Sequence, residues 1–365
     1  MFPRALLVAL LVFTVVVAPA AAIDWQIETI DVIHTSGFRA SLALDSQGTP
    51  HIIYLVQSSG DFRYATRVSG AWSVQLAHAH LDSRMGPTTV ILPGDVPAFS
   101  AAGDFFVRTG PSWLNEDMGT DGFWCSTAAV GPDGAVQGIS QGSFGSGAYI
   151  GFLNAAERHE GVWSEQKLLM NTVFYPLQPS ESMIVDANGN PHASVTTTNT
   201  EPLRYWHREN GVWLSEPLSL GLWSSIALDA QGSPRISFYD AAEQNLVVAT
   251  RDANGWTLTP IDETGDVGLY TSQVVRNNVS YVSYYDKTNG DLKLATFVSP
   301  NQFSTTTVDT NGDVGAWTSL AIDAQGRPQI AYQDAGNGQL KYASGAVPLA
   351  TRSSTLGGLK ALYRH

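Results

Sequence analysis

The feature that most constrains the fold is a repeated pattern of short strands and tight turns. Its clearest copy covers residues 317–344, where SLAID, PQIAYQD and QLKYAS are separated by turns containing Gly, Asn and Asp. The pattern recurs from Ala40, Glu181 and Ser224, and in a more divergent form over residues 277–296. A period of 40 to 55 residues built only from short strands is typical of a β-propeller with one four-stranded blade per repeat.

The number of blades follows from the fourth strand of each repeat, which begins with an aromatic residue. Six such residues occur along the chain: Trp72, Trp113, Trp163, Trp213, Trp256 and Phe303. The last repeat has none, but DWQIETID at Asp24 matches GWTLTPID at Gly255, so the N-terminal segment is expected to supply the missing strand. Such closure removes the free sheet edges of an open array. We therefore predict an all-β, seven-bladed β-propeller of four-stranded antiparallel blades, closed by the N-terminal strand.

The two ends of the chain do not follow the repeat. Arg4, an apolar run over residues 5–17 and small residues up to Ala22 predict a signal peptide over residues 1–22, with a retained N-terminal anchor as the alternative. The propeller is expected to span residues 23–348. Residues 349–365 form a basic tail, interpreted as a solvated end or, alternatively, as a sorting or anchoring signal. The protein is expected to be secreted, periplasmic or at the cell surface, without a membrane span once the signal is removed.

Charge and cysteine content restrict the partners. The chain has 20 Lys and Arg against 33 Asp and Glu, a formal net charge of −13 at pH 7, so nucleic-acid binding is not expected. The one cysteine, Cys125, cannot form an internal disulfide and is expected to be a small buried residue of the third blade. We predict no cofactor and no metal site, and expect a monomer whose partner is a glycan or a surface protein.

Candidate ligand-binding residues gather where the loops of a propeller open around its central axis. Aromatic residues occur at or near the start of the first strand of several repeats: Phe38, Trp124, Trp223, Tyr270 and Trp317. The turns after the second strand begin with Asp240, Asp286 and Asp334. Aromatic faces beside carboxylates suit sugar rings, because C–H faces stack on the ring and hydroxyls donate to the carboxylate. The alternative is that the aromatics plug the ring and the aspartates cap turns.

Two further patterns resemble metal sites. Asp309, Asn311 and Asp313 alternate like the opening of a calcium loop, but the Gly is one place late and no Glu completes it, which favours a structural turn. His78, His80 and Asp82 form H-x-H-x-D, but no third imidazole is evident for a metal.

Catalytic signals are sparse. The sequence has no G-x-S-x-G and no H-E-x-x-H motif. A pair of carboxylates for glycoside cleavage stays open, because blades bring distant residues together.

The repeat S-L/I-A-L/I-D-x-x-G-x-P-x-I-x-Y-x-D resembles propeller repeats of secreted bacterial proteins. It is similar to the Asp-box (BNR) repeat of sialidase-like propellers in the turns from Asp229 to Gly232 and from Asp323 to Gly326. It departs from that box in having Pro234 and Pro328 where an aromatic is expected. The overall shape is also similar to that of propeller lectins. These resemblances imply the fold more than an activity.

The sequence thus predicts a secreted, non-catalytic recognition module that binds a glycan or cell-surface polymer on the central loop face. The alternatives are a polysaccharide-acting hydrolase or lyase on the same face, and a protein-interaction or surface-display scaffold.

Overall fold

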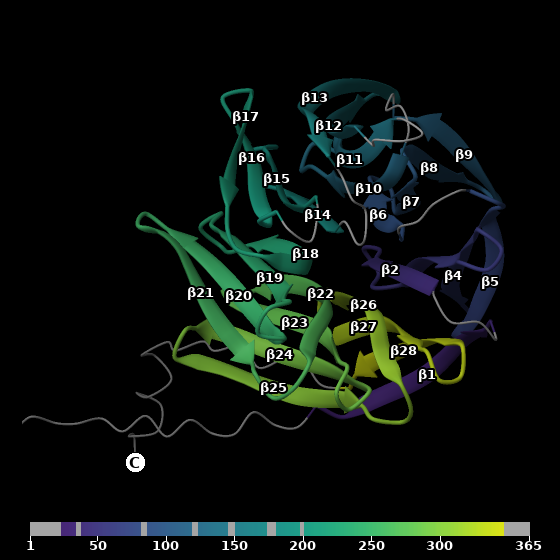
Figure 1. Cartoon of the computed structure of the whole chain (residues 1–365). Helices are drawn as coiled ribbons and strands as arrows, with labels where there is room; N and C mark the ends of the chain where they lie inside the picture. The colour runs from purple at the N-terminus through teal and green to yellow at the C-terminus, as the bar shows by residue number, and fades with distance from the viewer. Residues whose placement is uncertain are drawn as a thin grey trace, which may run out of the picture.

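The computed structural model describes residues 23–33, 38–81, 86–118, 123–144, 150–173, 180–197 and 201–346. The predicted signal peptide and basic tail lie outside these ranges. All regular elements in the described part are strands, and they form seven separate four-stranded sheets arranged around one centre (Figure 1). In each sheet, the first strand of the sequence repeat lies nearest the centre (Figure 1). This is the predicted seven-bladed β-propeller.

The first three blades contain consecutive antiparallel strands, as predicted from the repeat. Blade 1 contains β2 (Phe38–Leu44), β3 (Pro50–Val56), β4 (Asp61–Val68) and β5 (Ala71–His78). Blade 2 contains β6 (Thr88–Leu92), β7 (Val96–Ala101), β8 (Asp104–Thr109) and β9 (Ser112–Asp117). Blade 3 contains β10 (Phe123–Val130), β11 (Val136–Phe144), β12 (Ile150–His159) and β13 (Val162–Val173).

The next three blades follow the same order. Blade 4 contains β14 (Ser180–Val185), β15 (Pro191–Thr196), β16 (Arg204–Glu209) and β17 (Val212–Pro217). Blade 5 contains β18 (Gly221–Leu228), β19 (Pro234–Asp240), β20 (Asn245–Asp252) and β21 (Gly255–Asp262). Blade 6 contains β22 (Val267–Arg276), β23 (Val279–Asp286), β24 (Asp291–Ser299) and β25 (Gln302–Asp309).

Blade 7 joins the two ends of the propeller. It contains β26 (Val314–Ile322), β27 (Pro328–Asp334), β28 (Gln339–Gly345) and the N-terminal strand β1 (Trp25–Val32). Strand β1 pairs antiparallel with β28, from Trp25 opposite Gly345 to Val32 opposite Gln339. The predicted closure by the N-terminal strand is therefore confirmed.

The core lies between blades rather than inside one. Every residue of β3 and of β27 is buried, which explains why the second strand of each repeat is apolar on both faces. One cluster contains Leu42, Ile52 and Tyr54 of blade 1 together with Leu340 and Tyr342 of blade 7. Each blade is thus stabilised by its neighbours, as in other repeat architectures.

The aromatic residue that opens the outer strand also links neighbouring blades. At three interfaces its indole N–H donates to a glutamate of the preceding blade, over 3.0–3.1 Å, and that glutamate also pairs with an arginine. The three sets are Glu28–Arg67–Trp72, Glu116–Arg158–Trp163 and Glu216–Arg251–Trp256.

A second polar link joins the last three interfaces of the ring. An aspartate at or near the end of an outer strand accepts a tyrosine hydroxyl, over 2.6–2.7 Å, and a Lys or Arg of the following blade. The three sets are Asp31–Tyr54–Arg63, Asp262–Tyr284–Lys293 and Asp309–Tyr332–Lys341. Each aspartate is paired and hydrogen-bonded, as a buried charge requires.

The innermost strands are connected by a row of serines, here called the serine belt. Each hydroxyl accepts the backbone N–H of the next blade's innermost strand, over 2.8–3.1 Å. The pairs are Ser182–Ile226, Ser225–Gln273, Ser272–Leu320, Ser319–Leu42 and Ser41–Thr89. These are the serines that open the repeat motif, so their recurrence has a structural cause.

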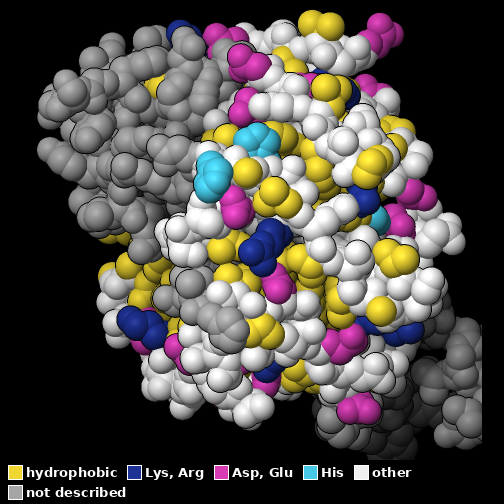
Figure 2. Space-filling view, turned by 90° about the vertical axis from the view of Figure 1, so that its right-hand side faces the viewer, with side chains coloured by type: hydrophobic (Ala, Val, Ile, Leu, Met, Phe, Trp, Pro, Cys, Tyr) yellow, Lys and Arg dark blue, Asp and Glu magenta, His cyan; other side chains and the backbone are white. Residues whose placement is uncertain are grey.

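The outer strands carry scattered apolar side chains. Val74, Leu76 and Leu114 are exposed on β5 and β9. Figure 2 shows the corresponding side of the molecule, where apolar, acidic and basic side chains are interspersed. No helix in the described ranges is long and apolar enough to cross a membrane.

Candidate functional site

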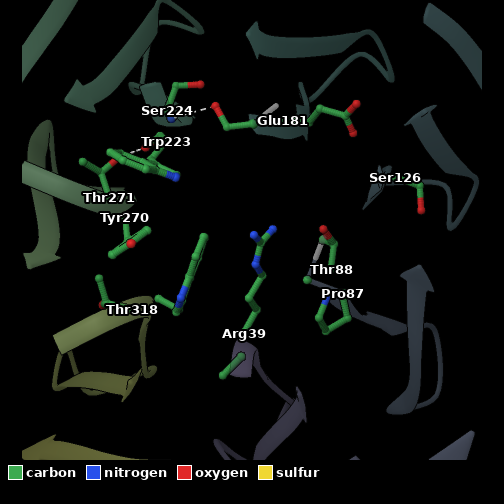
Figure 3. A pocket seen from close by; sticks show the side chains of 14 residues that line it. Arg39, Pro87, Thr88, Ser126, Glu181, Trp223, Ser224, Tyr270, Thr271 and Thr318 are labelled. Carbon is green, nitrogen blue, oxygen red and sulfur yellow. Dashed lines mark hydrogen bonds between the residues drawn. The ribbon is translucent and has the colours of Figure 1, made fainter. Parts of the chain in front are cut away.

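A pocket of about 160 Å³ lies where the innermost strands of the seven blades converge, and we call it the axial pocket (Figure 3). Every blade contributes to its wall. The lining residues are Arg39, Ala40, Gly86, Pro87, Thr88, Ser126, Ser180, Glu181, Trp223, Ser224, Tyr270, Thr271, Trp317 and Thr318. The structure therefore brings together three of the predicted aromatics from blades 5, 6 and 7.

The three aromatic side chains form a continuous wall. The ring centroids of Trp223 and Tyr270 are 4.8 Å apart, and those of Tyr270 and Trp317 are 4.0 Å apart. Tyr239 lies 5.4 Å from Trp223, and Tyr285 lies 6.2 Å from Tyr270, so the wall is supported from behind. This contiguity gives a ligand one extended apolar face rather than isolated rings.

A backbone irregularity produces the wall. The register of β18, β22 and β26 shifts at each aromatic residue, so that two residues of the inner strand oppose one of its partner. The φ angles of Trp223, Tyr270 and Trp317 are 49°, 57° and 52°, in the left-handed region. That region costs bulky residues roughly 1–3 kcal/mol and is concentrated at functional sites. The same strain occurs at three equivalent positions, so the surrounding structure maintains the orientation of all three side chains.

Tyrosine hydroxyls connect the wall to the loops before β22 and β26. Tyr239 donates to Asp266 over 2.8 Å, and Tyr285 donates to Asp313 over 2.5 Å. Burial and these carboxylates raise the pKa of both tyrosines, so the hydroxyls stay protonated donors at neutral pH. The two loops therefore position the tyrosines behind the aromatic wall, and Asp313 belongs to the loop that resembles a calcium site in sequence.

Arg39 extends the wall into blade 1. Its guanidinium carbon lies 3.9 Å from the centroid of the Trp317 ring, a cation–π contact. A Cβ on Gly86 would lie 2.6 Å from Arg39 Cβ, so the glycine allows the arginine stem to pass. Figure 3 shows the guanidinium reaching toward the middle of the ring of blades. The result is a fixed, planar set of hydrogen-bond donors beside the aromatic wall.

Sequence reasoning missed Arg39, although a signal for it existed. It lies two residues before Ser41 of the serine belt, as Trp223, Tyr270 and Trp317 lie two residues before theirs. The aromatic pattern instead indicates Phe38, the preceding residue, because an arginine does not belong to that pattern.

The other side of the axial pocket is polar. Its wall includes Thr88 of blade 2, Ser126 of blade 3, and Ser180 and Glu181 of blade 4. Among the pocket-lining residues that the structure describes, Glu181 is the only carboxylate. The axial pocket is therefore amphipathic, with an apolar, cationic half and a hydroxyl-rich half.

Two buried polar atoms of the wall have no hydrogen-bond partner within the described ranges. They are the Ser126 hydroxyl, on a residue that is 3% exposed, and the indole N–H of Trp223. Buried polar groups in native proteins are generally paired, and an unpaired one needs an explanation. A polar ligand seated in the pocket would provide it.

The three predicted aspartates have other partners. Asp286 and Asp334 are 1% and 2% exposed and accept hydrogen bonds from Asn289 and Asn337 in their own turns. Asp240 accepts backbone N–H bonds within its turn. None of the three is among the described residues that line the axial pocket. Their geometry corresponds to the turn-capping alternative, and ligand contact by them stays a prediction.

For two of the predicted residues, the structure describes the backbone only. The backbones of Phe38 and Trp124 belong to β2 and β10, and the register of β10 shifts between Phe123 and Cys125, at Trp124. Their side chains, and that of Cys125, lie outside the described part of the structure.

The first carboxylate of the candidate calcium loop is bound by groups of the protein itself. The Asp309 carboxylate accepts the backbone N–H of Asn311 over 3.0 Å and the Lys341 ammonium over 2.6 Å. Burial alone would raise the pKa of Asp309, but these donors lower it overall. Within the described ranges, no three His, Cys, Asp or Glu side chains are grouped to hold a metal.

Histidines in the described part have structural contacts. His51 and His192 bond Tyr64 and Tyr205 over 2.5 and 2.6 Å within their blades. His80 is largely exposed beside Asp61, and Asp82 of the H-x-H-x-D motif lies outside the described residues.

Comparison with known proteins supports the fold. No protein-family model matches the chain, and no curated protein sequence matches it. Among solved structures, it is similar to a protein of unknown function from Dyadobacter fermentans, with 14% identity, a TM-score of 0.50, and coverage of 87% of this chain and 98% of that one. AofleA from Arthrobotrys oligospora gives 10% identity, a TM-score of 0.51, and coverage of 90% and 88%.

A microbial sialidase, Hz136, is also similar, with 12% identity and a TM-score of 0.52. The match covers 86% of this chain and 66% of the sialidase chain. At these identities the likenesses concern the fold alone.

Proposed function

We propose that this protein is a secreted, non-catalytic recognition module that binds a glycan or cell-surface polymer in the axial pocket. The observation that carries the proposal is the wall formed by Trp223, Tyr270 and Trp317, each held at a strained φ. A sugar ring presents one C–H face and a rim of hydroxyls, which matches the apolar and polar halves of the pocket.

The charged groups of the pocket fit the same ligand class. Arg39 supplies several donors in one plane, and sugar hydroxyls accept them. Glu181 and the hydroxyls of Ser126 and Ser180 supply the complementary acceptors and donors on the polar half. A glycoside hydrolase of the usual kind, one form of the enzymatic alternative, needs two carboxylates facing one bond. The described lining holds one, so recognition is the better supported function.

The test is a glycan-array screen of residues 23–365, with calcium and with chelator. Trp223→Ala combined with Trp317→Ala should weaken each hit by roughly 30-fold or more, as expected for aromatic residues that dominate an interface. Phe303→Ala is the matched control, because Phe303 is 43% exposed on the outer strand β25. Hits that survive the double substitution would place binding elsewhere.

Secretion is part of the proposal and rests on residues 1–22. Expression of the full chain in a secreting bacterial host should yield a product whose N-terminus begins near residue 21 or 23. An intact N-terminus in the membrane fraction would instead support the retained anchor.

A further inference from the structure

The axial pocket is enclosed on every side in the plane of the ring. Its wall is built from the innermost strand, or the residues just before it, of all seven blades. A groove that accepts the middle of a chain needs two open ends across the face of the molecule. Within the described residues, this pocket opens along the axis.

The serine belt lies immediately beneath the pocket. Ser225, Ser272 and Ser319 each follow two residues after an aromatic of the wall and bond the neighbouring innermost strand. None of these three serines lines the pocket, so the cavity ends above the belt in blades 5 to 7. Strands joined at hydrogen-bond distance around the axis give the pocket a continuous side wall.

The volume of the axial pocket is also small. At about 160 Å³, the axial pocket is smaller than the roughly 300–1,000 Å³ of typical ligand pockets. It suits about one sugar unit rather than several.

We propose that the axial pocket binds the terminal unit of a glycan end-on, and does not bind internal segments of a chain. This inference rests on the proposed function and adds which part of the polymer is recognised. The terminal ring stacks on Trp223, Tyr270 and Trp317, and its hydroxyls face Ser126, Ser180 and Glu181. The rest of the chain leaves the pocket along the axis into solvent.

The first experiment is a glycan array on which each terminal sugar is presented on several different internal chains. Signals should group by terminal sugar and ignore the internal sequence. The methyl glycoside of the recognised sugar, added free, should bind within about tenfold of the whole oligosaccharide, since little contact lies beyond the first unit. Grouping by internal sequence, or a free glycoside more than about a hundredfold weaker, would overturn the inference.

A cyclic glycan provides an independent test, because it has no terminal sugar unit. For a glucose-terminated hit, linear maltoheptaose should bind and β-cyclodextrin should not. Equal binding of the two would refute end recognition while leaving glycan binding intact. An array without any signal would refute the proposed function, and the end-on inference with it.

A substitution in the polar half of the pocket tests sugar recognition while the protein stays folded. Ser126→Ala keeps the aromatic wall and removes a pocket hydroxyl that has no hydrogen-bond partner within the described ranges. It should change the ranking of terminal sugars on the array, whereas Phe303→Ala should leave the ranking unchanged. An unchanged ranking for Ser126→Ala, with the protein folded, counts against a terminal ring seated beside blade 3.

Discussion

The strained backbone of the aromatic wall makes a quantitative prediction at Tyr270. At an ordinary strand position, glycine is less stable than alanine by roughly 0.5–1 kcal/mol, because it loses more chain entropy on folding. The φ of Tyr270 is 57°, in the left-handed region, where a residue with a Cβ is disfavoured by roughly 1–2 kcal/mol. The two effects oppose each other, and the second is larger.

We therefore expect Tyr270→Gly to be more stable than Tyr270→Ala by about 0.5–1 kcal/mol, the reverse of the usual order. Both variants lack the phenol ring, so the comparison isolates the backbone. The measurement is urea unfolding followed by fluorescence, with the free energy extrapolated to water.

Ala40 provides the control, because it lines the same pocket and is not among the residues with positive φ. Ala40→Gly should lower the stability by about 0.5–1 kcal/mol. If Tyr270→Gly proved no more stable than Tyr270→Ala, the wall would not be strained, and the argument from strain to function would fail.

Three further predictions concern the ring. Ser272→Ala leaves the buried N–H of Leu320 without its acceptor and should cost about 1–3 kcal/mol in urea unfolding; a cost below 0.5 kcal/mol would count against the belt. Gly315→Ala places a Cβ 2.7 Å from the Leu292 backbone at a φ of 107°, so at least about 2 kcal/mol should be lost, visible as a lower Tm. Burial alone would raise the pKa of Glu157, but hydrogen bonds from three side chains lower it to about 2, below its ordinary value of 4.5. Its contribution to stability is therefore present above pH 4.5 and lost as the pH falls toward 2, and Glu157→Gln should flatten that part of the profile, measured by thermal unfolding against pH.

The fold could be predicted from the sequence because recurring residues mark where each repeat begins and ends. The aromatic residue at the start of the outer strand marked every blade, and the match between Asp24 and Gly255 located the closing strand. Together, the turn residues and the recurring repeat favour a single arrangement, in which every strand is paired.

The axial pocket was only half predictable. Trp223, Tyr270 and Trp317 could be identified because their place in the repeat puts them near the axis. The direction of a turn aspartate such as Asp334 was not predictable, because its place at the start of the turn is compatible both with facing a ligand and with accepting from Asn337 in the same turn. The bulges that turn the aromatics toward the pocket depend on the register between the first two strands of each repeat, which strand periodicity alone does not define.

The serine belt also bears on how such a ring can change its size. The repeats of blades 1, 5, 6 and 7 carry both halves of the link. In blade 7, for example, the hydroxyl of Ser319 accepts from blade 1 while the adjacent N–H of Leu320 donates to blade 6. A duplicated repeat would bring its own acceptor and its own donor, and could enter the ring without any complementary change in its neighbours. Gene duplication could therefore lengthen or shorten this chain by whole repeats, with selection left to act on the few pocket positions that differ between blades.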